Sequence, residues 1–455
     1  MTDEGKSVLA HDDQLTEDIN NKAYGTDGNT AQDQRALSDA QMNSTNTLYD
    51  ALGPVLGKYY KDAADAGKLP KTAQFLSDMN KSASTGVAKA TYQHPRPYVD
   101  RVNFNGTTLN MNGLKQTLNI KKVPGYENFD WGDGEAPDNE YDGLYNSGSF
   151  PSGHTTFAFT QGAGLSYLLP ELGPEIMTRV SEAGNNRIVL GVHYPLDIMG
   201  GHIAGQYGVA TAVSGEKTAQ EGAAARAELV DYLTAQCKAD NHGDTLDACI
   251  TNTGANAANG YRNDFTDEVS TKPVTDRASA LAAYKARMTY GFQATGTTGQ
   301  APVVPDSAVR MLDNVAAFKS LDSAQKKAVL AATEGDSGYP LDASSQGWAR
   351  VNLAAAYSAK VTLSADGKNV VKVEPGQAQA SVVRETSGSN GNNGGNGNGG
   401  SNAGNTGVNN ASGRNPSGTQ PLSKTGADVS GIASAFILIA AAGVTITMIR
   451  RKHAI

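Results

Sequence analysis

The chain has 455 residues, of which 39% are hydrophobic, and a formal net charge of -8 at pH 7. This is enough apolar material for one large or two modest folded domains, so the sequence is not that of a protein disordered throughout. The acidic balance argues against nucleic acid as a main partner, because binding to a phosphate backbone needs a clustered basic face and the sequence contains none.

The chain begins with a polar N-terminal segment, residues 1–30. Its first 13 residues are polar and acidic and lack the basic start and apolar run of a signal peptide. Because the C-terminal features described below indicate export, we expect the true N-terminus to be missing from this chain.

Helix-compatible residues with apolar spacing dominate the rest of the chain, whereas alternation typical of strands is scarce. Residues 361–373 are the exception, and their alternation around Asp366-Gly367 predicts a β-hairpin. The predicted fold class is therefore all-α, a helical bundle over residues 31–300 with an extension over 301–384 that packs on it and carries the hairpin. The predicted helices lie at residues 31–57, 72–89, 155–169, 198–213, 215–238 and 307–332.

The fixed positions of three short segments carry two histidines, three cations and one carboxylate. They read K-x6-R-P at residues 89–97, P-S-G-H at 151–154 and R-x5-H-x3-D at 187–197. One such histidine or arginine alone is more often structural, but three ordered segments together are strong evidence for a site. The candidate site residues are Lys89, Arg96, Ser152, Gly153, His154, Arg187, His193 and Asp197.

These residue types suit phosphate-ester chemistry. The non-bridging oxygens of a phosphoryl group carry negative charge, and Lys89, Arg96 and Arg187 can surround them with donors. Ser152 and the Gly153 amide precede a predicted helix, whose N-terminal N–H groups favour anions. These five residues are therefore the predicted phosphate-binding set.

The carboxylate of the third segment can orient its histidine. Asp197 lies four residues after His193, so the two meet on one helical face if a helix spans both. Pro195 lies between them and suggests the alternative, in which a helix starts near His193 and Asp197 reaches back.

The order and spacing of the three segments resemble those of the type 2 phosphatidic acid phosphatase superfamily. It includes soluble bacterial class A acid phosphatases, membrane lipid phosphatases and vanadium-dependent haloperoxidases. The resemblance implies that His193 becomes a phosphohistidine, while His154 protonates the leaving alkoxide and later activates water. The family usually has serine before the third-segment arginine, whereas Asn186 precedes Arg187 here, so we expect altered bonding around that arginine without lost catalysis.

The function implied is that of a metal-independent acid phosphatase acting on phosphate monoesters, of the bacterial class A type, without a cofactor. No hydrophobic span interrupts the core, which separates the chain from multi-span lipid phosphatases. The first alternative is a vanadium-dependent haloperoxidase, in which vanadate occupies the same anion site. A surface adhesion protein with an inactive site is the second. The seven histidines show no close metal-ligand spacing, and we interpret His94 and His202 as structural or rim residues.

Residues 127–142 are the densest acidic stretch of the chain. We interpret them as a solvated loop. The alternatives are a lid that limits access by highly anionic substrates and a calcium-binding loop, although the spacing does not match an EF-hand.

Two cysteines, Cys237 and Cys249, are the whole complement of the chain. They are even in number and close enough to close a small loop, so we predict a disulfide between them in an exported protein. Two unpaired thiols are the alternative.

The C-terminal part has two further segments. Residues 385–420 are dominated by Gly, Asn and Ser and cannot bury enough apolar surface to fold, so we expect a disordered linker. Residues 421–455 combine L-S-K-T-G, an uncharged apolar run and a basic end. This order resembles a Gram-positive cell-wall sorting signal, whose usual motif is L-P-x-T-G and which has Ser423 at the proline position here.

That resemblance implies that a sortase cleaves between Thr425 and Gly426 and attaches the protein to peptidoglycan. The apolar run, residues 429–449, is long enough to span a bilayer with the basic residues retained inside. A simple C-terminal membrane anchor is therefore the alternative. In both cases the folded part faces outward, so we expect a location at the cell surface.

Overall fold

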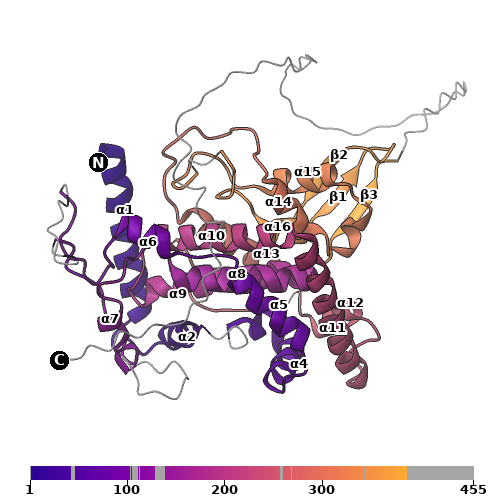
Figure 1. The fold of residues 1–455 in the computed structure, drawn as a ribbon, viewed down its shortest axis with the longest axis horizontal. Coiled ribbons are helices and arrows are strands. Elements are labelled where there is room, and N and C mark those ends of the chain that lie inside the picture. The colour runs from indigo at the N-terminus through magenta and orange to yellow at the C-terminus, as the bar shows by residue number, and fades with distance from the viewer. Residues whose placement is uncertain are drawn as a thin grey trace, which may run out of the picture. The chain divides into compact units, whose positions relative to one another are not determined.

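The computed structural model describes residues 2–42, 47–102, 104, 111, 113–128, 139–256, 260–267, 269–342 and 345–386 (Figure 1). Described residues up to Glu385 belong to one unit by their contacts. The predicted cleavage site at Thr425 and Gly426, the apolar run and nearly all of the predicted linker lie outside the described residues.

Three successive helices form the centre of the unit and pack side by side (Figure 1). Small residues let them approach closely: a Cβ atom at Gly162 would lie 2.4 Å from a methyl carbon of Val180, and one at Gly205 would lie 2.5 Å from Cβ of Phe159. These glycines therefore set the helix spacing. The three helices are α8 (Gly153–Leu168), α9 (Gly173–Val189) and α10 (Pro195–Val213).

Further helices surround this centre, and short 3-10 helices carry the label η. Before α8 in the chain come α1 (Asp3–Tyr24), α2 (Ala31–Ala40), η1 (Tyr49–Leu52), α4 (Gly53–Asp65), α5 (Pro70–Asn80), α6 (Gly86–Tyr92), η3 (Tyr126–Asn128) and α7 (Glu140–Gly143). The remaining helices are η4 (Pro170–Leu172), α11 (Glu216–Ala239), α12 (Leu246–Thr253), α13 (Arg277–Thr289), α14 (Asp306–Val309), η5 (Arg310–Leu312), η6 (Ala316–Ser320), α15 (Ser323–Thr333) and α16 (Leu353–Tyr357).

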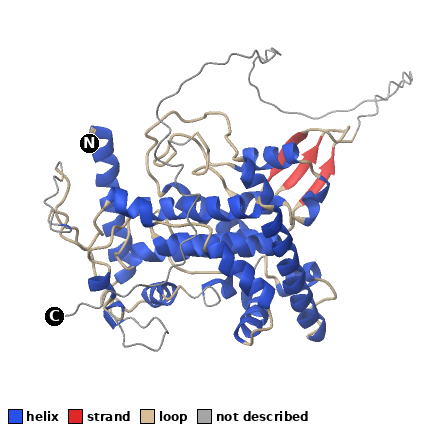
Figure 2. Ribbon diagram, in the orientation of Figure 1, coloured by secondary structure: helices blue, strands red, loops and turns tan. Residues whose placement is uncertain are grey.

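A small sheet follows the last helix, with strands β1 (Lys360–Leu363), β2 (Val370–Glu374) and β3 (Ser381–Arg384) in the order β2-β1-β3 (Figure 2). The antiparallel pair β1 and β2 is the predicted hairpin. Strand β3 pairs with β1 in parallel and was not predicted. The mostly helical architecture with this small sheet confirms the predicted fold class.

Three predicted helices are broken in the structure. The segment predicted at 31–57 contains α2, η1 and the start of α4, because Pro54 lies in the first turn of α4, where proline starts a helix. The segment at 72–89 splits into α5 and α6 around Ser- and Thr-rich residues that compete with helix formation. The segment at 307–332 is interrupted before α15, which Asp322 caps with its carboxylate.

Several helices were not predicted, among them α1, α9, α12 and α13. Helix α1 lies within the polar segment 1–30 and packs against α9. Its buried side chains include Leu15 and Ile19, but also Asp13, which pairs with buried Arg101 at 2.8 Å. Helix α9 is buried at every position although it carries charged residues such as Glu175, Arg179 and Glu182, a residue type that usually lies at the surface.

A disulfide joins Cys237 of α11 to Cys249 of α12. Both cysteines are fully buried within the main hydrophobic core. The bond therefore ties two consecutive helices together at a place remote in sequence from the three segments singled out above.

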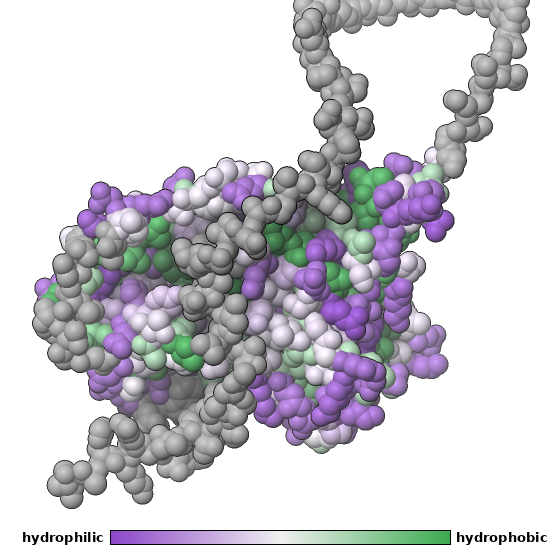
Figure 3. Space-filling model, turned by 45° about the horizontal axis from the view of Figure 1, so that its top comes forward, coloured by the Kyte–Doolittle hydropathy of each residue, from purple (hydrophilic) through white to green (hydrophobic). Residues whose placement is uncertain are grey.

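The surface of the unit is mainly polar on the face shown in Figure 3, where hydrophobic residues form small separate groups. Within the described ranges, no helix is both long and apolar enough to cross a membrane. Of the acidic stretch 127–142, the structure describes residues 127–128 and 139–142, and the predicted loop between them lies outside the described residues.

Candidate active site

His193 and Asp197 form a hydrogen-bonded pair at the start of α10. His193 lies in the turn between α9 and α10, and its Nδ1 is 3.0 Å from Oδ2 of Asp197. The same carboxylate oxygen accepts a bond from the backbone N–H of Tyr194 at 2.9 Å. Helix α10 begins at Pro195, so the carboxylate reaches back across the first turn. This is the second of the two arrangements that the sequence allowed.

The contacts of His193 fix its tautomer. A carboxylate only accepts hydrogen bonds, so the proton of the neutral ring lies on Nδ1. Nε2 lies 3.1 Å from Nη1 of Arg96, which donates to it. Burial, then Arg96, Lys89 and Arg187, hold the pKa of His193 well below its usual value. The ring is therefore neutral, with a lone pair on Nε2.

Arg96 is locked by backbone carbonyls. Its Nε donates to Leu144 O at 3.1 Å and to Ser147 O at 3.0 Å, and Nη1 donates to Val192 O at 2.9 Å. The side chain is buried. A cation held by fixed acceptors cannot swing away, so Arg96 presents a fixed positive charge beside Nε2 of His193.

Arg187, in the last turn of α9, is less completely satisfied. Its Nη2 donates to the hydroxyl of Tyr126 at 2.8 Å, and its guanidinium lies 5.5 Å from the centre of the Tyr126 ring. Within the described residues, Nε and Nη1 have no hydrogen-bond partner although Arg187 is only 1% exposed. Buried donors without partners are costly, so these two nitrogens suit an anion that binds there.

Lys89 approaches the site from α6. Its Nζ donates to the carbonyl oxygens of Gly148 and Ser149, the latter at 3.3 Å. Burial, then Arg96, lower the pKa of Lys89, and burial raises the pKa of Asp197. A bound anion would stabilise the charged form of Lys89 and so reverse this effect.

Ser152 and Gly153 lie at the N-terminus of α8. The Ser152 hydroxyl oxygen caps the helix by accepting a bond from Thr155 N at 3.2 Å, and the Ser152 N–H donates to Asp197 O at 3.0 Å. Ser152 is fully buried. This residue therefore joins the start of α8 to the start of α10, and Gly153 follows at the first helical position.

His154, the second residue of α8, is half-buried, and its Nε2 lies 3.1 Å from the carbonyl oxygen of Ala40. Burial, then Arg187, hold the pKa of His154 well below its usual value. His154 is also among the groups that lower the pKa of His193. Ala40 lies at the end of α2, far from the three segments in sequence.

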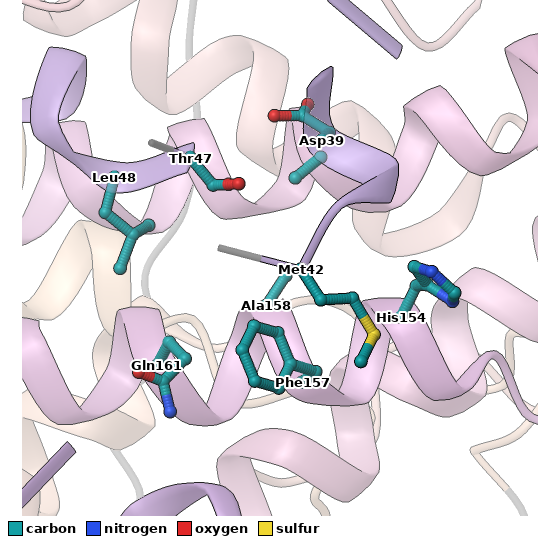
Figure 4. A pocket seen from close by; sticks show the side chains of 9 residues that line it. Asp39, Met42, Thr47, Leu48, His154, Phe157, Ala158 and Gln161 are labelled. Carbon is teal, nitrogen blue, oxygen red and sulfur yellow. The ribbon is translucent and has the colours of Figure 1, made fainter. Parts of the chain in front are cut away.

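A shallow recess of about 310 Å³, including space open to solvent, lies beside His154 between the end of α2 and α8 (Figure 4). It is lined by Asp39, Met42, Thr47, Leu48, His154, Phe157, Ala158, Gln161 and Ala183.

Asn186, the residue before Arg187, is fully buried. Its amide donates to Oδ2 of Asp39 at 2.8 Å. Asp39 in turn binds Arg179 through both carboxylate oxygens. The residue before Arg187 is thus tied to α2.

The two unassigned histidines have structural contacts. Nδ1 of His94 lies 3.0 Å from Oγ of Ser149, whose hydroxyl donates to Asp197 at 3.3 Å, and burial lowers the pKa of His94 to about 4. His202 lies 2.8 Å from the Tyr284 hydroxyl, and burial lowers its pKa to about 3. Both rings are therefore neutral at physiological pH.

Hydrogen bonds join Arg96, His193, Asp197 and Ser152. Lys89 bonds to the carbonyl of Ser149, Gly153 follows Ser152, and Arg187 and His154 act electrostatically on His193. The sequence reasoning missed Tyr126, Ala40 and Ser149, which contact Arg187, His154 and Asp197. Of these, only Ser149 stands next to a recognised segment. Across the described residues there is no group of three or more His, Cys, Asp or Glu side chains that could hold a metal ion.

Comparisons with known proteins agree with the site. Residues 73–219 match the model of the PAP2 superfamily, and this range contains all three segments. The chain is similar to a non-specific acid phosphatase from Providencia stuartii, 28% identical over 189 residues, which are 40% of this chain and 61% of the relative. An acid phosphatase from Zymomonas mobilis is 32% identical over 205 residues, 44% of this chain and 61% of the relative.

A non-specific acid phosphatase from Salmonella typhi is 27% identical over 184 residues, 40% of this chain and 60% of the relative. The chain therefore spans about three fifths of the length of the curated relatives it matches. Helices α1 and α2 lie before the residues that match the superfamily model.

Proposed function

We propose that the protein is a metal-independent acid phosphatase that hydrolyses phosphate monoesters through a phosphohistidine on His193. One observation carries the proposal: Nε2 of a neutral, buried His193 lies next to fixed cations. The names of the relatives support the reaction class, since each is called an acid phosphatase.

The first step forms the phosphoenzyme. Nε2 of His193 attacks phosphorus while the bond from phosphorus to the ester oxygen breaks. Asp197 stabilises the positive charge that develops on the imidazole, and Arg96, Arg187 and Lys89 neutralise the non-bridging oxygens. His154, in its protonated form, gives its proton to the leaving oxygen.

The second step releases phosphate. His154, now neutral, accepts a proton from water, whose oxygen attacks phosphorus as the bond to Nε2 breaks. Phosphate leaves and His193 returns to its neutral state. The bound dianion favours the protonated form of His154, which opposes the effect of burial and of the nearby cations on its pKa.

Phosphate release from p-nitrophenyl phosphate by the full chain, with a metal chelator present, tests the proposal. We expect turnover by the wild type, loss of at least about 10³-fold in His193→Ala, and no loss in the control His242→Ala, a histidine in the loop between α11 and α12. Equal activity of wild type and His193→Ala would refute the proposal. A parallel assay of bromide oxidation with vanadate and peroxide tests the haloperoxidase alternative, which the names of the relatives do not favour.

We also propose that the folded part is displayed at the cell surface and attached to peptidoglycan by a sortase. The support is the order of the motif at residues 422–426, the apolar run and the basic end. Incubation with a sortase and a labelled nucleophile should label the chain at Thr425, and replacement of Thr425 by Ala should abolish labelling. Labelling that survives this replacement would contradict the assignment.

A further inference from the structure

A backbone carbonyl of a distant helix holds His154. The carbonyl oxygen of Ala40 lies 3.1 Å from Nε2 of His154. A carbonyl only accepts hydrogen bonds, so Nε2 carries a hydrogen in this contact. The neutral ring then has its lone pair on Nδ1, and a second proton binds at Nδ1.

Ala40 is the last residue of α2. The last four carbonyl groups of a helix have no partner within the helix, so this oxygen can accept a bond from His154. The C-terminal end of a helix also carries partial negative charge, which favours an imidazolium. The Ala40 contact raises the pKa of His154, whereas burial and nearby cations lower it. Among the described residues, the charged or titratable groups that act on His154 or on which it acts include Lys89, Arg96, Arg187 and His193.

The residue before Ala40 anchors this end of α2 to α9. Oδ2 and Oδ1 of Asp39 accept bonds from Nη1 and Nη2 of Arg179 at 3.0 and 2.5 Å, and Oδ2 also accepts the Asn186 amide at 2.8 Å. Asp39 and Arg179 are both buried, so the pair is shielded from solvent. Because Asn186 precedes Arg187, this anchor joins the helix end that holds His154 to the turn that carries an anion-binding arginine.

We propose that Asp39 is a positioning residue for His154: by anchoring the end of α2 it keeps the Ala40 carbonyl on Nε2, so that proton transfer to the leaving oxygen takes place from Nδ1. This inference rests on the phosphatase function proposed above. In the transfer, the Nδ1–H bond breaks, an O–H bond forms on the leaving oxygen, and the neutral imidazole keeps its hydrogen on Nε2.

Part of the proposed active site therefore lies outside the residues that match the superfamily model. Helix α2 precedes residue 73, where the match begins. The N-terminal helical segment is then a component of the site in this chain.

The test compares two substrates that differ in their need for a proton. p-Nitrophenolate is a stable anion and leaves with little protonation, whereas the alkoxide from glycerol 2-phosphate needs a proton. In Asp39→Asn, we expect kcat for glycerol 2-phosphate to fall about tenfold more than kcat for p-nitrophenyl phosphate. Asn186→Ala, which leaves the pair of Asp39 and Arg179 intact, should give a smaller change in the same direction.

The matched control is Glu175→Gln. Glu175, in the first turn of α9, is a buried carboxylate that, like Asp39, accepts two hydrogen bonds from one arginine, here Arg277. The Glu175→Gln variant should lower stability as Asp39→Asn does, but leave the ratio of the two kcat values unchanged.

The outcomes separate this inference from the proposed function. A wild type that releases no phosphate from either substrate would refute the function. An active wild type whose Asp39→Asn variant loses the same factor on both substrates would refute the positioning role alone. Should Asp39→Asn not fold, nitrogen-15 NMR of histidine in the wild type decides: a hydrogen on Nε2 of neutral His154 supports the inference, and a hydrogen on Nδ1 overturns it.

Discussion

The hydroxyl of Tyr126 lies 2.8 Å from Nη2 of Arg187 and accepts a hydrogen bond from it. The ring of Tyr126 also lies under the guanidinium. This bond fixes Nη2 of Arg187, and with it the directions of Nε and Nη1. Tyr126 is thus a support for the arginine that we expect to bind phosphate.

Replacement of Tyr126 by Phe keeps the ring and removes only the acceptor. A hydrogen bond to a charged group contributes about 1.5–3 kcal/mol, so we expect kcat/KM for p-nitrophenyl phosphate to fall about 10- to 100-fold. Tyr141→Phe is the control, because its hydroxyl bonds to Leu190 O and not to Arg187. Loss of activity in Tyr141→Phe equal to that in Tyr126→Phe, at matched stability, would show that the effect is not specific to Arg187.

Replacement of Asp197 by Asn tests the negative charge that supports His193. The Asn carbonyl oxygen can still accept the bonds from Tyr194 N–H and from Nδ1–H of His193, but the neutral amide no longer stabilises the positive charge that develops on the ring. We expect kcat to fall by about 10²- to 10³-fold.

Ser149→Ala is the milder comparison, because it removes one 3.3 Å bond to the same carboxylate. Ser149→Ala should lower kcat by roughly tenfold or less. An Asp197→Asn variant that keeps more activity than Ser149→Ala would exclude the proposed orientation.

The pH dependence follows from the two histidines. His193 must be neutral to attack, and its pKa is lowered, so activity should persist as the pH falls below the usual range of histidine. His154 must be protonated to assist the leaving group, and its pKa is also lowered, so activity should decline as the pH rises. We therefore expect a bell-shaped profile of kcat/KM with its maximum below about pH 6.5. A flat profile between pH 4 and 8, or an alkaline maximum, would be incompatible with this pair.

The disulfide between Cys237 and Cys249 closes a short loop that is remote in sequence from the three segments. Closing a loop of this length restricts the unfolded chain, so the double variant Cys237→Ala/Cys249→Ala should lose about 2–4 kcal/mol in the free energy of unfolding. Urea denaturation measures the loss, and kcat at 25 °C should stay within about twofold of the wild type. Unchanged stability would mean that the bond contributes nothing to the fold.

Much of the candidate site could be proposed from the sequence because its residues lie in three short segments with fixed spacing. Lys89, Arg96, His154, Arg187 and His193 were each identified from the sequence, and the structure brings them together. Local spacing could not decide how Asp197 reaches His193, because this depends on where α10 begins.

The contacts that hold the site in place were not predictable. Tyr126 and Ala40 belong to no motif, and a carbonyl oxygen has no sequence signal at all. Helix α1 was missed because Asp13 and other polar side chains on its buried face find partners elsewhere in the chain, such as Arg101. Helix α9 was missed because charged residues such as Arg179 and Glu182 usually lie at the surface, whereas here they are buried and pair with Asp39 and Arg35.

The central claim is that His193 carries the phosphoryl group, and trapping of that intermediate tests it most directly. The full chain is mixed with a phosphorus-32-labelled monoester, stopped within milliseconds in alkaline detergent, and digested for mass spectrometry. We predict labelled peptide with phosphate on Nε2 of His193, and none in His193→Ala. Label on another residue, or hydrolysis by the wild type with no labelled His193 at any time, would contradict the account.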